Sequence, residues 1–281
     1  MNNKKSIEEL KDLSYELRYK LLTMCGTYGG IVHIGGDLSI ADIFTVLFHN
    51  TLNINPKDIN MPTRDRFVLS KGHSAVCMYI VMSMLGFFDY DDIVSTYGMV
   101  DSAYGMHPCK VQLPGVECSS GSLGQGLAMA VGMAFSAKRK KENHRVFCIM
   151  GDGETCEGSV WEAAQTASSY NLGNLVSVID RNKQLMTSHT EDIIKLEPYC
   201  DKWRSFGWNV IECDGHDINS LVNAFDSLSD INNGKPTVVV CNTIKGKGVS
   251  FMERNIGWHA GSLSEDDMNK ALMELKKGYE E

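Results

Sequence analysis

The chain has 281 residues and a formal net charge of −8, from 35 acidic and 27 basic side chains. This acidic balance argues against a protein that binds nucleic acid through a basic surface. Hydrophobic residues make up 43% of the chain and charged residues 22%, which is ordinary globular usage and excludes a disordered or collagen-like protein.

The N-terminal segment shows no signal for secretion. Residues 1–22 are charged throughout and lack the apolar stretch of a signal peptide, and no apolar run in the chain approaches the roughly 18 residues of a membrane span. Nine cysteines are scattered singly, without the CxxC pairs of a zinc site or the even number of a disulfide framework. We therefore expect a cytoplasmic protein with reduced cysteines and no contact with a membrane.

Helices are predicted at both ends of the chain. The apolar spacing over residues 6–25 predicts an amphipathic helix, and Ser39 is expected to cap a second helix that runs as far as Leu47. Residues 264–281 are predicted to form a solvent-exposed terminal helix. None of these segments carries evident chemistry.

Short apolar runs rich in β-branched residues alternate with helical stretches in the rest of the chain. Strands are predicted at residues 145–150, 174–180, 208–213 and 236–243, with 67–70 as a further candidate. Continuous apolar strands separated by helices are typical of a parallel sheet covered on both faces. The expected fold class is therefore α/β, in one domain over residues 1–281, because no linker divides the chain and such domains often reach about 250 residues.

Two of these strands end in residues suited to a site for a metal and a diphosphate. Gly151 and Gly153 would let backbone N–H groups approach a phosphate, whereas Asp152 between them would repel it unless a cation intervened. Asn182 follows the next strand 30 positions later and could add a side-chain oxygen, and Gln184 a backbone carbonyl. For the GDG triplet alone, a structural turn is an equally good interpretation.

Motifs for other nucleotides are absent or misplaced. The chain has no GxxxxGK[ST] element, and the glycine-rich stretch 121–126 has the wrong spacing for GxGxxG and follows no clear strand. A dinucleotide-dependent oxidoreductase is therefore disfavoured.

The sequence from Gly151 to Asn182 resembles the thiamine diphosphate motif of the transketolase superfamily, in which GDG and a later Asn hold Mg²⁺ and the cofactor's diphosphate. Other segments resemble transketolase segments in the same order, at residues 33–48, 64–73, 107–134, 151–163 and 243–261. The likeness covers only the first of three transketolase domains. The chain thus resembles the N-terminal, thiamine diphosphate-binding subunit of a split transketolase, with the pyrimidine-binding and C-terminal domains and the activating glutamate on a partner chain.

The resemblance implies a transferase that is active only with that partner, in an α2β2 complex. It would move a two-carbon ketol unit from a ketose phosphate to an aldose phosphate, with thiamine diphosphate and Mg²⁺ (or Ca²⁺) supplying the carbanion chemistry. The alternatives are another thiamine diphosphate enzyme, such as one like 1-deoxyxylulose-5-phosphate synthase, and a non-catalytic cofactor-binding regulatory subunit. The presence of four histidines in matching segments favours catalysis.

These four histidines have roles that the resemblance implies. His33 and His259 would transfer protons at the substrate carbonyl and hydroxyl, His73 would contact cofactor and substrate, and His107 would bind a substrate hydroxyl. Imidazole suits such proton transfer near pH 7, although each histidine alone could equally be structural. The other four are His49, His144 and His216, which are interpreted as structural residues, and His189, whose role stays open.

The implied cofactor contacts extend beyond the histidines. Gly121 and Leu123 match the loop that supports the cofactor, and Met186 falls where an apolar side chain packs on the thiazolium ring. Glu157 matches a carboxylate that meets its counterpart across the dimer, and Lys245, with Lys247, could neutralise diphosphate. The expected cofactor set is His73, Gly121, Leu123, Gly151, Asp152, Gly153, Glu157, Asn182, Met186, Lys245 and His259, with Asp152, Asn182 and Gln184 as metal ligands.

Four residues near this set depart from the family pattern. Val32 and Met106 replace the usual glycines before His33 and His107, and Thr187 and Ser188 replace an Asp-Gly pair. We therefore expect the donor to be a modified ketose derivative with a branched or differently charged tail.

Overall fold

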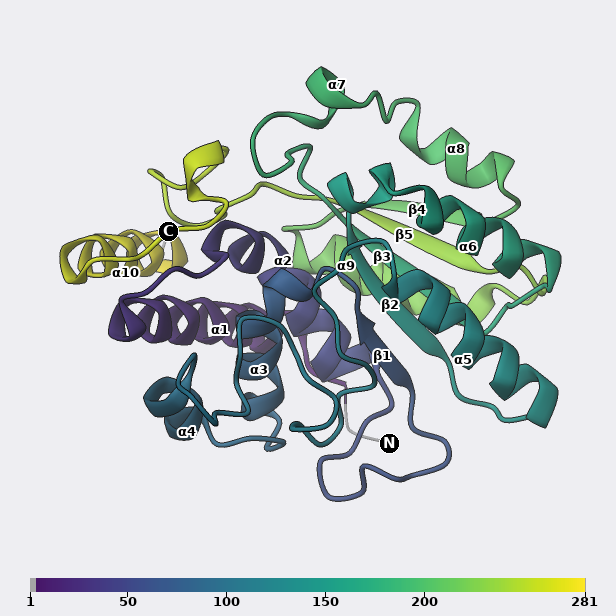
Figure 1. The fold of residues 1–281 in the computed structure, drawn as a ribbon, viewed down its shortest axis with the longest axis horizontal. Helices are drawn as coiled ribbons and strands as arrows, with labels where there is room; N and C mark the ends of the chain where they lie inside the picture. The colour runs from purple at the N-terminus through teal and green to yellow at the C-terminus, as the bar shows by residue number, and fades with distance from the viewer. Residues whose placement is uncertain (1–3, 281) are drawn as a thin grey trace.

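A five-stranded sheet forms the centre of the computed structural model, which describes residues 4–280 (Figure 1). All its strand pairs are parallel. In the order in which they lie side by side, the strands are β1 (Arg66–Leu69), β2 (Val146–Gly151), β3 (Leu175–Arg181), β5 (Thr237–Asn242) and β4 (Asn209–Asp214). The predicted α/β class and strand positions are confirmed, including the candidate strand at 67–70.

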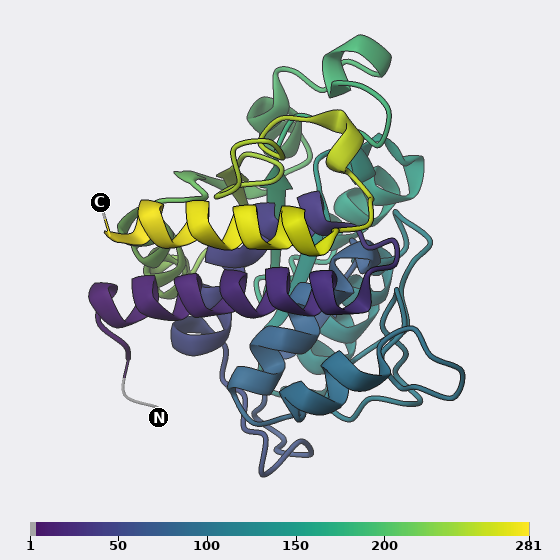
Figure 2. The same cartoon turned by 90° about the vertical axis from the view of Figure 1, so that its left-hand side faces the viewer.

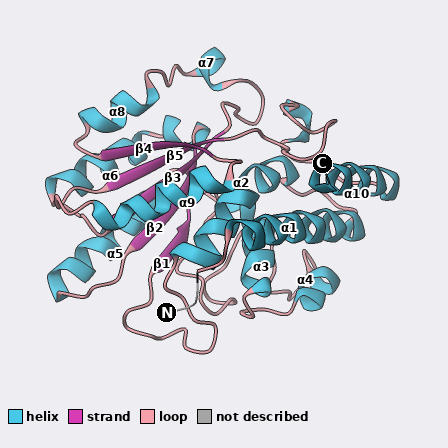
Figure 3. Ribbon diagram, turned by 180° about the vertical axis from the view of Figure 1, so that it is seen from behind, coloured by secondary structure: helices cyan, strands magenta, loops and turns pink. Residues whose placement is uncertain are grey.

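The central strands β2, β3 and β5 are mainly apolar and almost entirely buried, since helices cover both faces of the sheet, whereas the edge strand β4 is partly exposed. Along β2, Phe147 and Ile149 point into one core cluster, whereas Val146, Cys148 and Met150 point into the other, since successive side chains of a strand face opposite sides. The first cluster includes side chains of α1, α2, α3, α9 and α10, and the second includes side chains of α5, α6 and α8. Figures 1 and 3 show helices on both sides of the sheet.

The helices in chain order are α1 (Ile7–Tyr28), α2 (Ile34–Val46), α3 (Ala75–Met84), α4 (Tyr90–Thr96), α5 (Gly126–Lys140), α6 (Gly158–Ser169), α7 (Thr190–Ile193), α8 (Tyr199–Ser205), α9 (Ile218–Asp226) and α10 (Glu265–Glu280). Shorter helical turns are η1 (Leu47–Thr51), η2 (Gly72–Ser74), η3 (Gly153–Cys156), η4 (Ser227–Asp230) and η5 (Ile256–Trp258). Within residues 4–280, no helix has both the length and the apolar composition to cross a membrane.

The predicted N-terminal helix forms with a clear start and stop. The Ser6 Oγ accepts a hydrogen bond from the Glu9 N–H, and the Ser6 N–H donates to the Glu9 carboxylate at 2.7 Å, which is a reciprocal capping arrangement. Helix α1 ends at Tyr28 and is capped by Gly29, whose φ of 64° is a left-handed conformation that glycine adopts without strain.

Two helix predictions need correction. Ser39 does not cap a helix, because α2 begins at Ile34 and Ser39 lies inside it, where its hydroxyl donates to Gly36 O at 3.0 Å and to Asp180 Oδ2 at 2.6 Å. The terminal helix α10 is not simply solvated, because Ala271 and Leu275 are buried. Figure 2 shows α10 lying along α1; Glu281, the last residue of the predicted helix, lies outside the described residues.

Candidate active site

A cavity of about 450 Å³ lies beyond the carboxyl ends of the parallel strands, where open α/β sheets bind their ligands. The loops that follow β1, β2, β3 and β5 contribute to its walls. The predicted site residues that line it are His33, His73, His107, Gly121, Leu123, Gly153, Glu157, Asn182, Gln184, Met186, Lys245 and His259. Gly151, Asp152 and Lys247 do not line it.

The four histidines from the matching segments form one cluster in this cavity. His33 precedes α2, His73 lies in η2 and His259 follows η5. The ring centre of His33 lies 5.4 Å from that of His73, 5.4 Å from that of His259 and 6.1 Å from that of His107. Chain segments far apart in the sequence therefore bring four imidazoles to one wall.

All four imidazoles lose proton affinity in this setting. Burial and then Lys245 lower the pKa of His259 to about 4, and burial together with Lys71 lowers the pKa of His73 well below its usual range. The pKa values of His33 and His107 are also lowered, chiefly by burial. Neutral imidazoles can both accept and donate hydrogen bonds near pH 7, which suits a site that handles hydroxyl and carbonyl groups.

Asp152 lies behind the cavity wall and is 2% exposed. Its carboxylate accepts hydrogen bonds from Gly153 N at 2.8 Å and from Lys183 N at 2.6 Å, so the loops after β2 and β3 meet here. Burial, followed by the nearby charge of Asp180, raises the pKa of Asp152 to about 7. A bound cation would relieve the cost of ionising this buried carboxyl group.

The atoms at this corner of the site that could bind a metal ion are all oxygens. Asn182 Oδ1 accepts from Gln184 N at 3.1 Å, and Gln184 O accepts from Lys245 Nζ at 3.1 Å. Among the described residues, no group of three or more His, Cys, Asp or Glu side chains could hold a metal. These oxygen atoms are of the kind that Mg²⁺ and Ca²⁺ prefer, and Mg²⁺ takes most of its ligands from phosphate and water.

Lys245 connects three parts of the site through its ammonium group. It donates to Gln184 O and to Leu185 O at 3.0 Å, and its nitrogen lies 3.3 Å from His259 Nδ1. Burial and the neighbouring Lys71 lower its pKa to about 8. The predicted Lys245 thus lies where it can contact an anion in the cavity.

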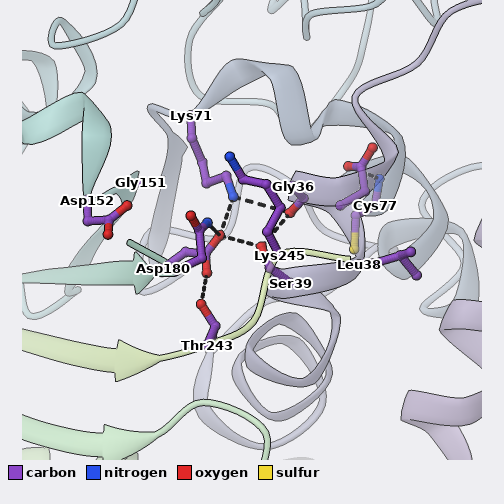
Figure 4. A network of polar contacts seen from close by, with 12 residues as sticks. Gly36, Leu38, Ser39, Lys71, Cys77, Gly151, Asp152, Asp180, Thr243 and Lys245 are labelled. Atoms are coloured by element: carbon purple, nitrogen blue, oxygen red, sulfur yellow. Dashed lines mark hydrogen bonds and ion pairs between the residues drawn. The ribbon is translucent and has the colours of Figure 1, made fainter. Parts of the chain in front are cut away.

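A buried network that sequence reasoning missed adjoins the cavity, which its members Lys71 and Gly36 help to line (Figure 4). Lys71 Nζ donates to Asp180 Oδ2 at 2.5 Å and to Gly36 O at 3.2 Å, and the hydroxyls of Ser39 and Thr243 donate to the same Asp180 carboxylate. Lys71 and Asp180 are 1% and 0% exposed. The charged residue within the apolar run of β3 was the signal that could have revealed this network.

Glu154 was also missed, although it directly follows the GDG triplet. Its buried carboxylate accepts from Gly124 N at 2.9 Å, from Gly151 N at 3.3 Å and from the Ser70 hydroxyl. One side chain therefore holds together the end of β1, the GDG turn and the glycine-rich loop. Within that loop, Gly121 has a φ of +146°, and a Cβ there would lie 3.1 Å from the His107 ring, so a larger residue would disturb the histidine cluster.

Two predicted residues are largely open to solvent. Met186 is 65% exposed, and Glu157 is an exposed residue directly before α6 whose side chain makes no capping hydrogen bond. Both line the cavity.

The fold and site thus define a parallel α/β protein in which a histidine cluster and Lys245 line one cavity beyond the carboxyl ends of the strands, with the buried Asp152 carboxyl group beside it. The family described as transketolase, thiamine diphosphate binding domain, matches residues 27–280. The chain belongs to this family.

Relatives and solved structures agree with this assignment. Over 271 residues the chain is 41% identical to one subunit of an apulose-4-phosphate transketolase of Actinobacillus succinogenes, covering 96% of this chain and 97% of the relative. It is 37% identical to one subunit of a 6-deoxy-6-sulfo-D-fructose transketolase of Clostridium sp., covering 88% and 90%. The transketolase structure from Campylobacter jejuni superposes with a TM-score of 0.89 at 27% identity, covering 97% of this chain and 43% of that one.

These matches confirm the predicted family, the fold and the assignment to a transketolase-type transferase as one of its subunits. The chain spans less than half the length of the solved transketolases that it matches. By contrast, it spans nearly the whole of the relatives named as subunits.

Proposed function

We propose that this chain is the diphosphate-binding subunit of a two-subunit transketolase, which moves a two-carbon ketol unit from a ketose phosphate to an aldose phosphate. The observation that carries the proposal is the cluster of His33, His73, His107 and His259 in the same cavity as Asn182 and Lys245. A subunit that only bound the cofactor would not need four neutral imidazoles there. When bound, thiamine diphosphate supplies the nucleophilic carbon for this transfer.

The residues have separate tasks in this proposal. Asp152, Asn182 and the Gln184 carbonyl would hold Mg²⁺ or Ca²⁺, and Lys245 would offset the diphosphate charge. The surface on which the cofactor lies would be formed by Gly121, Leu123, Gly151, Gly153 and Met186. His33 and His259 would move protons at the substrate carbonyl and hydroxyl, His73 would contact both cofactor and substrate, and His107 would bind a substrate hydroxyl.

A partner chain completes the proposed enzyme. Residues 1–281 would form one diphosphate-binding domain, and the partner would add the pyrimidine-binding and C-terminal domains with the activating glutamate, in an α2β2 complex. Met186 and Glu157 line the cavity and are exposed, which supports a partner chain that would cover them. All nine cysteines are free, which supports a reducing, cytoplasmic compartment.

We propose a modified ketose derivative with a branched or differently charged tail as donor, because the relatives are named for apulose-4-phosphate and 6-deoxy-6-sulfo-D-fructose. Of the four departures from the family pattern, Thr187 lines the cavity. Val32 is buried and pairs with Gly261 in an isolated bridge, so it would act only through His33. Comparing branched and sulfonated ketoses with xylulose 5-phosphate tests this point; equal rates on all of them would contradict it.

Cofactor binding can be measured apart from turnover. Calorimetric titration of the chain with thiamine diphosphate should show binding that depends on Mg²⁺. Asp152→Ala should weaken that binding by tenfold or more, since loss of even an outer-shell partner typically costs about 10–100-fold in metal affinity. Asp201→Ala, which changes an exposed carboxylate, is the matched control and should bind like the wild type.

Catalysis requires the partner. After co-expression with a candidate C-terminal subunit, such as the product of an adjacent reading frame, the complex should transfer ketol units. His33→Ala and His107→Ala should each lower the rate by roughly 100-fold or more, whereas His144→Gln, outside the cavity, should not. Normal rates in the two alanine variants would favour a regulatory subunit, and condensation of pyruvate with an aldehyde would favour the synthase-like alternative.

A further inference from the structure

His216 uses both of its ring nitrogens, although it lies outside the cavity in the loop between β4 and α9. Its Nδ1 is 2.8 Å from Asp42 Oδ2, and its Nε2 is 2.8 Å from Ile244 N. Because the Ile244 N–H can only donate, Nε2 must be the acceptor and Nδ1 must carry the proton. The contacts therefore define one neutral tautomer in a side chain that is 11% exposed.

Asp42 anchors this histidine to two helices. Arg18 of α1 donates to Asp42 Oδ1 at 2.7 Å and to Oδ2 at 2.6 Å, and Ser14 Oγ donates to Oδ1. Although burial alone would raise it, the charge of Arg18 and the hydrogen bond from His216 hold the pKa of Asp42 well below its usual range. An ionised carboxylate held by a forked guanidinium is a rigid acceptor.

Ile244 belongs to a loop whose consecutive residues are held from different sides. The preceding residue, Thr243, donates to Asp180, and the following residue, Lys245, donates to Gln184 O and Leu185 O. The hydrogen bond from Ile244 N to His216 Nε2 fixes the peptide that joins Thr243 to Ile244. The orientation of this peptide therefore affects the position of the Lys245 ammonium group.

We infer that His216 is a positioning residue for the cofactor site: it holds the Ile244 peptide so that Lys245 reaches the diphosphate. This inference rests on the proposed function. His216 does not line the histidine cavity, and its two ring nitrogens contact Asp42 and Ile244, so its route to the cofactor site runs through the loop after β5.

Two substitutions separate the two ring contacts. In His216→Gln, the side-chain oxygen can take the place of Nε2 and still accept from Ile244 N, whereas in His216→Asn the side chain can replace only Nδ1 and keeps the Asp42 contact. With the chain in its complex, we expect His216→Asn to raise the Kd for thiamine diphosphate with Mg²⁺ by about tenfold, as losses of supporting contacts around metal sites typically do. His216→Gln should stay within about threefold of wild type.

The unfolding midpoint provides the structural control, because each variant loses one hydrogen bond and both should be destabilised to a similar degree. A Kd that follows the unfolding midpoint, or equal binding by both variants, would overturn the inference. In a Lys245→Met background, the effect of His216→Asn on Kd should disappear, because the route through Lys245 is gone. A persisting effect would also overturn it.

Amide hydrogen exchange tests the contact without any cofactor. The Ile244 amide should exchange faster in His216→Asn and at the wild-type rate in His216→Gln; unchanged exchange in both would overturn the inference. If the wild-type chain bound no thiamine diphosphate, the proposed function would fail, while this exchange pattern would still report on His216.

Discussion

Asp37 is a buried carboxyl group in the first turn of α2 with one unpartnered oxygen among the described residues. Its Oδ1 accepts from Cys77 N at 3.1 Å, and its Oδ2 has no partner there. Burial raises the pKa of Asp37 from 3.8 to about 8, despite the opposing effects of the Cys77 N–H and Lys71. At neutral pH the folded chain therefore keeps a proton on Asp37 that the unfolded chain has lost.

This difference predicts a pH dependence of stability with a definite sign. Between about pH 4 and pH 8 the folded state binds the extra proton, so the contribution of Asp37 to the free energy of unfolding should fall as the pH rises, by about 1.4 kcal/mol per pH unit. Asp37→Asn cannot ionise, so its stability relative to wild type should increase across this window. Urea unfolding at several pH values measures the difference, and parallel pH profiles for the two proteins would show that Asp37 is already ionised when folded.

At the scale of elements, α10 joins the fold through a single helix face. Leu275 is 8% exposed on that face, whereas Met273 is 65% exposed. Near the end of the helix, the Tyr279 ring stacks on Tyr15 of α1 with centres 4.4 Å apart. Most stability of a short helix comes from such packing rather than from its intrinsic propensity.

We expect Leu275→Ala to lower the free energy of unfolding by about 2–4 kcal/mol, because it removes buried methyl groups and leaves a cavity. Met273→Ala, two positions away on the exposed side, should change it by less than about 0.5 kcal/mol. Chemical denaturation of both variants measures these changes in the free energy of unfolding. Equal effects would mean that α10 does not dock on α1.

At the scale of the whole molecule, the Lys71–Asp180 pair joins the end of β1 to the end of β3. The Asp180 carboxylate also accepts from Ser39 of α2 and from Thr243 after β5. Burial alone would raise the pKa of Asp180, but the charge of Lys71 and these hydrogen bonds hold it below its usual range. The carboxylate thus stays charged inside the protein only because its partners surround it.

Removing one partner should therefore be costly. Lys71→Met leaves a buried, uncompensated charge and should lower the free energy of unfolding by about 3–5 kcal/mol. Arg204→Met, which breaks the exposed ion pair with Asp201, should leave the unfolding midpoint nearly unchanged. The double variant Lys71→Met with Asp180→Asn should recover part of the loss; no recovery would mean that charge is not the cause.

The five strands and the meeting of Asp152 with the loop after β3 could be predicted from local patterns. Apolar β-branched runs record that both faces of a sheet are covered, and adjacent parallel strands end at the same edge, so their loops must meet there. The grouping of the four histidines was predicted only through the family resemblance, because nothing in their spacing brings them together.

Only the tertiary structure decided which buried polar groups pair. Lys71 and Asp180 are 109 positions apart, Ser70 and Glu154 are 84 apart, and Asp42 and His216 are 174 apart. Ser39 shows the same limit: its side chain suited a helix cap, yet the fold placed Asp180 within its reach. Periodicity and turn residues depend on a few neighbours along the chain. A buried charge instead pairs with a group that packing brings close to it, and no local sequence pattern indicates which group that is.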